Sequence, residues 1–245
     1  MKKKLHHKSA KADLKPFLLS IDSLFSDSSE VVHHDRNCTK KIKFKDSTYA
    51  VKSFKIPNYF QRVIYANFRK SKARRSFENS LKLLNSGINT PEPVGYVSFN
   101  NNFMIGKSFY ISNYHNFEFD LRYVFDNFKK NTEVISSFIK QVILMHDNDI
   151  YHHDLTRQNV LINKFENRID FCFIDNNRMS FKKMNLKDRM ESISKLTNDL
   201  DELNILADIY SEFSDFNSED CKYFILKGFN KSQNIKKFKR FIKGV

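Results

Sequence analysis

One short stretch of the chain holds most of the side chains that could do chemistry. Residues 151–162 read Tyr-His-His-Asp-Leu-Thr-Arg-Gln-Asn-Val-Leu-Ile, so Asn159 follows Asp154 by five positions. A second apolar run, 171–174, ends at Asp175. Carboxylate and amide oxygens at the ends of short apolar strands suit Mg²⁺, which proteins usually hold through one or two carboxylates together with substrate phosphates. Asp154 would then be available to orient and deprotonate an attacking hydroxyl.

This spacing resembles the H-x-D-x-x-x-x-N catalytic loop and the downstream metal-binding aspartate of the protein-kinase-like fold. In that fold a strand lysine binds the ATP phosphates and a glutamate on the next helix holds the lysine. Lys52 ends a Tyr-Ala-Val-Lys run of the V-A-I-K type, and Glu78 lies in a predicted helix. Simpler readings stay open: Asp154 and Asn159 can cap backbone groups in a turn, and Lys52 and Glu78 can be surface charges.

The elements that would position these residues change character along the chain. Apolar and polar residues alternate within 31–54, and again at 94–99 and 103–112, which predicts five antiparallel strands. Apolar residues at helical spacing predict one helix at about 71–86, with Gly87 as its stop.

The second half is mostly helical in pattern. A wide apolar face at 132–147 predicts a helix with a buried face, and short strands are expected at 160–162 and 169–174. The helical pattern then continues to the end of the sequence.

We therefore predict an α+β, two-lobed, protein-kinase-like fold. The expected divisions are a basic leader at 1–30 with a loosely attached helix, a nucleotide-binding lobe with the small antiparallel sheet and one main helix at 31–113, and a larger, mostly helical lobe at 114–245.

Longer stretches resemble one family, the bacterial lipopolysaccharide core kinases, which comprise the Kdo and heptose kinases and the related InaA-type proteins. The resemblance covers roughly residues 31–215 and is strongest at 51–93 and 150–180. It is carried by Val-Lys-Ser-Phe-Lys-Ile-Pro at 51–57, by the segments 69–78 and 87–93, and by Ile-Asp-Asn-Asn-Arg-Met at 174–179.

The resemblance implies ATP- and Mg²⁺-dependent phosphorylation of a sugar hydroxyl in the lipopolysaccharide inner core, with a lipid A–core precursor as the substrate. It assigns Lys52 to the ATP phosphates and Glu78 to Lys52. It also makes Asp154 the catalytic base, and Asn159 and Asp175 the metal ligands.

The sequence departs from the kinase pattern at the phosphate loop. No G-x-G-x-x-G motif precedes Lys52, and the turn at 35–38 contains no glycine. We expect Asn37 to substitute in part and to contribute to cofactor binding, because asparagine tolerates left-handed backbone geometry.

The catalytic loop departs as well. His153 stands where kinases have Arg or Gly, and Thr156 stands where protein kinases have Lys. Arg157 is therefore expected to supply positive charge near the transferred phosphate. The absence of a glycine after Asp175 argues against activation-loop switching. These departures keep two alternatives open: a pseudokinase or scaffold, and an atypical small kinase that acts on a protein or an RNA-linked partner.

Composition limits the classes of partner. The 245 residues are 40% hydrophobic and 29% charged, as in an ordinary folded protein, and the net charge is +14. This charge favours anionic partners, although codon bias of the source genome explains it equally well. The basic residues within 62–75, interleaved with aromatics, either dock an anionic inner-membrane surface or form a solvated helix face. We expect no nucleic-acid partner, because the aromatics are needed for packing.

Other candidate sites are weaker. The three cysteines lack metal or disulfide spacing, which favours a reducing cytoplasm. Gly106-Lys107-Ser108 mimics the end of a P-loop but lacks its first glycine, and is predicted to be a strand or turn. No apolar run approaches the ~18 residues that span a bilayer. We expect a cytoplasmic protein that could lie only peripherally on the inner membrane.

Overall fold

The computed structural model describes residues 4–9, 14–34, 37–56, 70–101, 104–166 and 168–243. The chain divides into two compact units. Unit 1 consists of Met1–Asn85, Thr90–Asn116 and Asp175–Asn177, and unit 2 of Ser86–Asn89, Phe117–Ile174 and Arg178–Val245. Arg62 and Arg69 of the predicted basic run lie outside the described residues, as do residues 35 and 36 of the expected phosphate loop.

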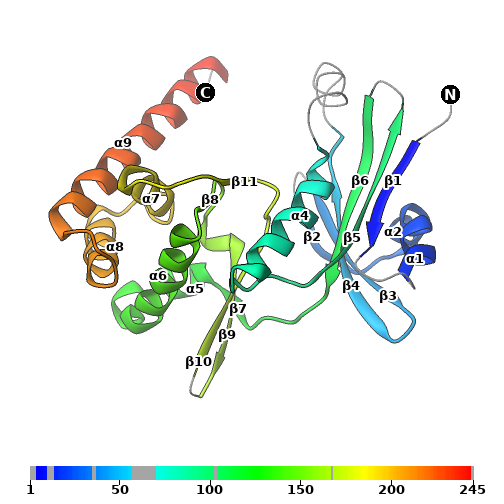
Figure 1. Cartoon of the computed structure of the whole chain (residues 1–245), viewed down its shortest axis with the longest axis horizontal. Coiled ribbons are helices and arrows are strands. Elements are labelled where there is room, and N and C mark those ends of the chain that lie inside the picture. Colours follow the sequence, from blue (N-terminus) through cyan, green and yellow to red (C-terminus); the bar gives the residue numbers. More distant parts are fainter. Residues whose placement is uncertain are drawn as a thin grey trace. The chain divides into compact units, whose positions relative to one another are not determined.

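The described strands of unit 1 form one antiparallel sheet in the order β1-β5-β6-β4-β3-β2 (Figure 1). Their bounds are β1 Lys4–Ser9, β2 Val31–His34, β3 Cys38–Phe44, β4 Ser47–Phe54, β5 Pro93–Asn101 and β6 Met104–Asn113. The five predicted strands are confirmed, and Gly106 lies within β6, as expected for a strand. The additional strand, β1, pairs with β5 and comes from the segment that we expected to be a leader.

Two short helices, α1 (Lys15–Leu19) and α2 (Ile21–Asp27), pack on one face of this sheet. Phe17, Leu18 and Ile21 are fully buried there. The expectation of a loosely attached helix is therefore wrong, because burying a large apolar side chain contributes about 1.5–3 kcal/mol and this segment buries three.

The opposite face of the sheet is covered by α4 (Lys72–Asn85). Phe77 of this helix packs against Phe54 of β4 and Tyr96 of β5. The helix predicted at 71–86 is confirmed, and Gly87 follows it with φ 72°. Glycine adopts this left-handed conformation without the steric cost that a Cβ brings, so it ends the helix here.

Unit 2 contains the remaining described elements. In chain order they are β7 Phe119–Asp120, α5 Leu121–Phe125, η2 Phe128–Lys130, α6 Thr132–Asp147, β8 Ile150–His152, η3 Arg157–Asn159, β9 Val160–Phe165, β10 Arg168–Phe173, β11 Met179–Phe181, α7 Leu186–Ile193, α8 Leu200–Glu212 and α9 Ser218–Lys243. Strands β10, β9 and β7 form one antiparallel sheet, and β11 pairs with β8.

Helix α6 lies at the centre of the unit 2 core. Its buried face includes Phe138 and Val142, as the apolar pattern predicted. The Phe138 ring lies 5.6 Å from that of Phe171 and 6.3 Å from that of Phe173, so α6 packs against β10. None of the helices in the described ranges combines the length and the apolar character needed to cross a membrane.

Candidate functional site

Lys52 lies on β4 in unit 1, on the same side of the strand as Phe54, which packs against α4. Its Nζ lies 3.0 Å from Oδ1 of Asp175, and the two side chains are 20% and 22% exposed. Because both groups are largely removed from water, their attraction is screened less than that of a surface pair. The structure therefore brings together two of the residues that the sequence singled out.

The segment that carries Asp175 is held by α4. Asn79 Nδ2 donates to the carbonyl of Asn176 over 2.6 Å, and Arg75 Nη1 donates to the carbonyl of Asn177 over 2.6 Å. Asn177 Nδ2 also donates to Oδ1 of Asp175. Asp175 itself has φ 60°, a left-handed conformation that few residues other than glycine, asparagine and aspartate adopt. These contacts fix the carboxylate beside Lys52.

Glu78 does not pair with Lys52, so this part of the family-based prediction is wrong. Its carboxylate instead binds Lys70 Nζ at 2.7 Å and Arg74 Nε at 2.8 Å. Burial opposes ionisation of Glu78, but these two hydrogen bonds outweigh it and lower the pKa. The physical reason lies in the helix: Arg75 and Asn79 share the face that meets the Asp175 segment, while Glu78 lies with Arg74 on the neighbouring face.

Asn37 does not have the backbone geometry that we expected of it. Among the described non-glycine residues, positive φ occurs at Lys45, Asp149 and Asp175, and Asn37 is not one of them. Its Oδ1 accepts a hydrogen bond of 3.2 Å from the amide of Lys55. The Asn37 side chain therefore ties the start of β3 to the segment that follows β4, rather than replacing a glycine.

Asp154 and Asn159 meet in unit 2. Asp154 follows β8, and its amide donates to His152 Nδ1 over 3.1 Å. The buried Asn159, at the end of η3, donates from Nδ2 to the carbonyl of Asp154 over 2.8 Å. Arg178 Nη1 lies 3.4 Å from Asp154 Oδ2. Asn159 thus caps a backbone group, as the simpler interpretation of the sequence predicted. The cap uses its NH₂ group, and its Oδ1 atom is of the type that binds a cation.

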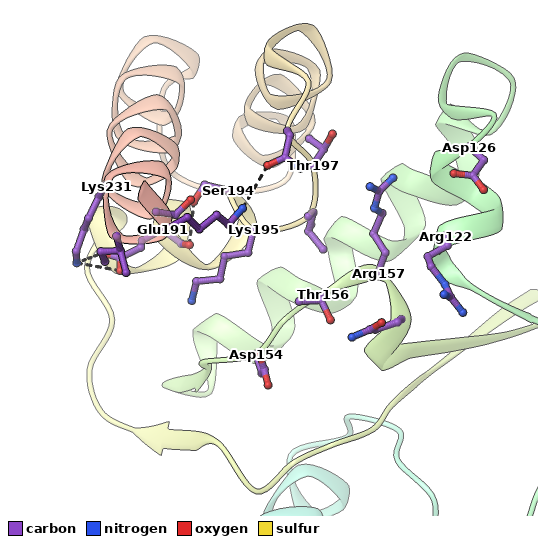
Figure 2. Close-up of a pocket in the computed structure, with 16 residues that line it drawn as sticks. Arg122, Asp126, Asp154, Thr156, Arg157, Glu191, Ser194, Lys195, Thr197 and Lys231 are labelled. Atoms are coloured by element: carbon purple, nitrogen blue, oxygen red, sulfur yellow. Dashed lines mark hydrogen bonds and ion pairs between the residues drawn. The ribbon is translucent and has the colours of Figure 1, made fainter. Parts of the chain in front are cut away.

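A pocket of about 630 Å³ lies beside Asp154 within unit 2 (Figure 2). Its walls come from α5, from the loop between Asp154 and η3, from the end of α7 and the segment that follows it, and from α9. Arg157 lines it, with its guanidinium 5.4 Å from the centre of the Phe125 ring. Lys231 of α9 is held at the rim by Glu191 of α7, 2.8 Å away.

Lys195 is a site residue that sequence reasoning missed. It lines the pocket, and its Nζ donates to Tyr151 OH over 3.0 Å and to the carbonyl of His153 over 3.2 Å. Burial lowers its pKa, an effect that the nearby charges of Glu191 and Asp154 partly offset. Lys195 thus supports the backbone next to Asp154. No sequence motif surrounds it, and it is one of 42 Lys and Arg residues.

His153 and Thr156, the two residues that depart from the kinase pattern, have distinct environments. His153 Nε2 lies 3.0 Å from Ser180 Oγ. Partial burial and the charges of Lys195, Lys182 and Arg178 lower its pKa, which favours the neutral imidazole. Thr156 also lines the pocket, and its Oγ1 is buried without a hydrogen-bond partner among the described residues.

Asp175 and Asn159, the predicted metal ligands, carry oxygen donors of the kind that suits Mg²⁺ better than a transition metal. Within the part of the chain that the structure describes, no group of three or more His, Cys, Asp and Glu side chains could hold a metal ion. The Asp175 carboxylate and the Asn159 amide oxygen are hard ligands of the kind that bind Mg²⁺ together with substrate phosphates. Asp175 belongs to unit 1 and Asn159 to unit 2.

Comparison with known proteins identifies the fold. No family model and no curated protein matches the sequence. The structure is similar to that of WaaP in complex with acyl carrier protein, with a TM-score of 0.64 and 11% identity over 94% of this chain and 98% of that one. It is also similar to the Rio2 kinase from Chaetomium thermophilum in an ADP/Mg²⁺–phosphoaspartate complex, with a TM-score of 0.52 and 11% identity over 95% of this chain and 81% of that one. The chain thus has the protein-kinase-like fold that its sequence predicted.

Proposed function

We propose that this protein is an ATP- and Mg²⁺-dependent kinase that phosphorylates a sugar hydroxyl, of Kdo or heptose, in the lipopolysaccharide inner core. The observation that carries the proposal is the position of Asp154, in the wall of a pocket of about 630 Å³ and on a loop held by Asn159. Pockets of roughly 300–1,000 Å³ are typical of small-molecule sites. In this proposal unit 1 is the nucleotide-binding lobe and unit 2 is the lobe that supplies the base and the acceptor pocket.

The residues of unit 1 would act on the nucleotide. The Lys52 ammonium would bind ATP phosphates, and the Asp175 carboxylate would hold Mg²⁺. The Asn159 amide oxygen, from unit 2, is the second proposed metal ligand. When bound, the metal neutralises charge on the transferred phosphoryl group. Phosphoryl transfer depends mostly on positioning and charge stabilisation, so these residues should dominate the rate.

The residues of unit 2 would act on the acceptor. Asp154 would accept the proton of the attacking sugar hydroxyl, with Arg178 orienting its carboxylate. Arg157, packed on Phe125, would contribute positive charge near the transferred group. Lys195 would position the loop through the carbonyl of His153.

Two lines of support favour a lipopolysaccharide acceptor. The sequence segments at 51–57, 69–78 and 87–93 resemble the core kinases. The similarity to WaaP extends over nearly the full length of both chains.

The decisive experiment is phosphate transfer from ATP to purified core oligosaccharide, read by mass spectrometry. The Asp154→Asn variant should lose at least a hundredfold in rate, because it cannot take up the proton. Asp170→Asn, which removes the charge of a partly exposed carboxylate on β10 that pairs with Arg168, is the matched control and should keep the native rate. A native rate for Asp154→Asn would show that Asp154 is not the base. Lipid A–core from cells with and without the gene should differ by one phosphate.

A scaffold that binds nucleotide without transferring phosphate is the second candidate. The observation in its favour is that Glu78 is engaged by Lys70 and Arg74 and Lys52 by Asp175, so the lysine–glutamate pair of active kinases is not formed. Mg²⁺-dependent ATP binding without turnover on any sugar would support this candidate. A mass increase of one phosphate on a protein acceptor would instead indicate an atypical small protein kinase.

A further inference from the structure

The last two and a half turns of α9, residues 235–243, carry side chains to which the proposed chemistry assigns no role. We call this segment the α9 tip. Its sequence contains five Lys or Arg residues and no Asp or Glu. Phe238 is 64% exposed and Phe241 is 83% exposed, and Ile235 is exposed as well. Earlier in the same helix, Cys221 and Ile225 are fully buried. The tip thus presents large apolar side chains that the rest of the described chain does not cover.

Within the tip, the apolar and basic side chains that the structure describes lie on different faces. At about 100° per residue, positions 235, 238 and 241 fall within an arc of about 120°. Lys236, Lys237 and Arg240 are also exposed and occupy the remaining side of the helix. Figure 1 shows these last, red turns extending past α7 and α8. The tip is therefore a basic amphipathic helix with both faces accessible.

We propose that the α9 tip binds the surface of an anionic lipid bilayer. Helices with an apolar face rich in Phe and a polar face rich in Lys and Arg lie in the headgroup region, with the apolar side chains inserted and the cations near anionic headgroups. Each cation near such a surface contributes roughly a fivefold gain in affinity, which corresponds to about 1 kcal/mol. The tip matches this partner in charge, because its cations are not offset by a single acidic residue within 235–243.

Because the tip borders the pocket, lipid binding at the tip bears on which acceptor the pocket would take. Ile235 and Lys236 belong to the tip and also line the pocket that contains Asp154. A bilayer bound at the tip would therefore lie next to this pocket, so the acceptor sugar would be one attached to a membrane lipid. This second step rests on the proposed function, whereas the lipid binding itself does not.

Vesicle sedimentation of the full chain tests the lipid binding. The protein should bind vesicles that contain phosphatidylglycerol, bind vesicles of pure phosphatidylcholine much more weakly, and lose binding as salt rises. Phe238→Ala/Phe241→Ala and Lys237→Glu/Arg240→Glu should each weaken binding at least tenfold. Two control variants change exposed side chains elsewhere in unit 2: Phe165→Ala removes an aromatic ring, and Lys129→Glu/Lys130→Glu removes two cations. Both controls should bind vesicles as the unmodified chain does. Circular dichroism should show unchanged helix content.

The outcomes separate this proposal from the proposed function. Asp154→Asn should lose phosphate transfer and keep vesicle binding. Phe238→Ala/Phe241→Ala should keep its rate on soluble core oligosaccharide and lose at least tenfold on the same acceptor embedded in anionic vesicles. Vesicle binding that neither α9 variant weakens, or no binding to anionic vesicles at low salt, would overturn the proposal. If the protein binds vesicles through the tip but phosphorylates no sugar, the lipid-binding proposal stands and the proposed function is contradicted.

Discussion

Lys52 and Asp175 form a largely buried ion pair, and this pair changes the role that can be assigned to Glu78. The two oxygens of Glu78 already accept hydrogen bonds from Lys70 and Arg74, so this carboxylate stabilises the start of α4 rather than holding Lys52. Asp175 is positioned by α4 through backbone contacts at Asn176 and Asn177. The lysine is therefore oriented by the same carboxylate that is proposed to hold the metal.

Replacing Lys52 and Glu78 in turn should separate their roles. Lys52→Met removes the ammonium proposed for the ATP phosphates, and should lower the transfer rate by a factor of roughly 10²–10³, as loss of a key charge donor does. Glu78→Gln keeps the side-chain shape and one acceptor oxygen for Lys70 or Arg74, and should lower the rate by less than threefold. Steady-state rates with ATP, together with melting temperatures as a folding control, check both. A Glu78→Gln loss as large as that of Lys52→Met would show that Glu78 moves to Lys52 when nucleotide binds.

At the scale of residues, the sequence could point to side chains capable of chemistry but not to the side chains that they contact. The sequence pointed to Asp154, Asn159 and Asp175, because their spacing places oxygen-bearing side chains at the ends of short apolar strands. Their roles as base and metal ligands stay predictions. The Lys52–Asp175 pair was not, since it depends on which face of α4 meets the Asp175 segment. Lys195 gave no local signal, because its contacts with Tyr151 and His153 join parts of the chain about 40 residues apart.

At the scale of elements, regular patterns were predictable and edge elements were not. Helices α4 and α6 bury one face, and the buried Tyr49 and Val51 alternate with less buried residues in β4, so these apolar residues recur at a fixed period. Strand β1 has the sequence Lys-Leu-His-His-Lys-Ser and joins the sheet as the partner of β5 through backbone pairing. Such a strand carries no apolar alternation. Helices α1 and α2 are too short to show a clear period, yet they cover one face of the sheet.

Helix α1 offers a direct test that the first 30 residues are part of the core. Phe17 is fully buried, and its ring lies 4.7 Å from that of Phe44 and 4.9 Å from that of Tyr49. Phe17→Ala should lower the free energy of unfolding by about 3–5 kcal/mol, the usual cost of emptying such a site. Leu19→Ala, in the same helix but exposed, should change it by less than about 0.5 kcal/mol. Urea denaturation measures both, and equal small effects would show that this segment is a loosely attached leader after all.

At the scale of the whole molecule, charge and burial act in opposite directions on stability. The net charge of +14 favours anionic partners but adds repulsion in the folded state as more groups become protonated. Unit 2 also buries an ionisable side chain that the proposed chemistry does not use. His146 of α6 is fully buried, and its Nδ1 lies 3.1 Å from the hydroxyl of Tyr210 on α8. The burial of this imidazole links the stability of the helical core to pH.

The pH dependence of unfolding should report on His146. Burial, with a smaller contribution from the charge of Arg189, lowers its pKa from 6.5 to about 3. The folded protein therefore keeps His146 neutral while the unfolded chain takes up a proton below pH 6.5, so this contribution to stability is complete above pH 6.5 and is lost as the pH falls towards 3. At pH 5 the loss is about 2 kcal/mol, from 1.36 kcal/mol per pH unit. His146→Gln cannot titrate, so the drop in unfolding free energy between pH 7 and pH 5 should be about 2 kcal/mol smaller in this variant, and urea denaturation at both values measures it. An identical drop in both proteins would show that His146 is protonated in the folded state and that the core of unit 2 admits water.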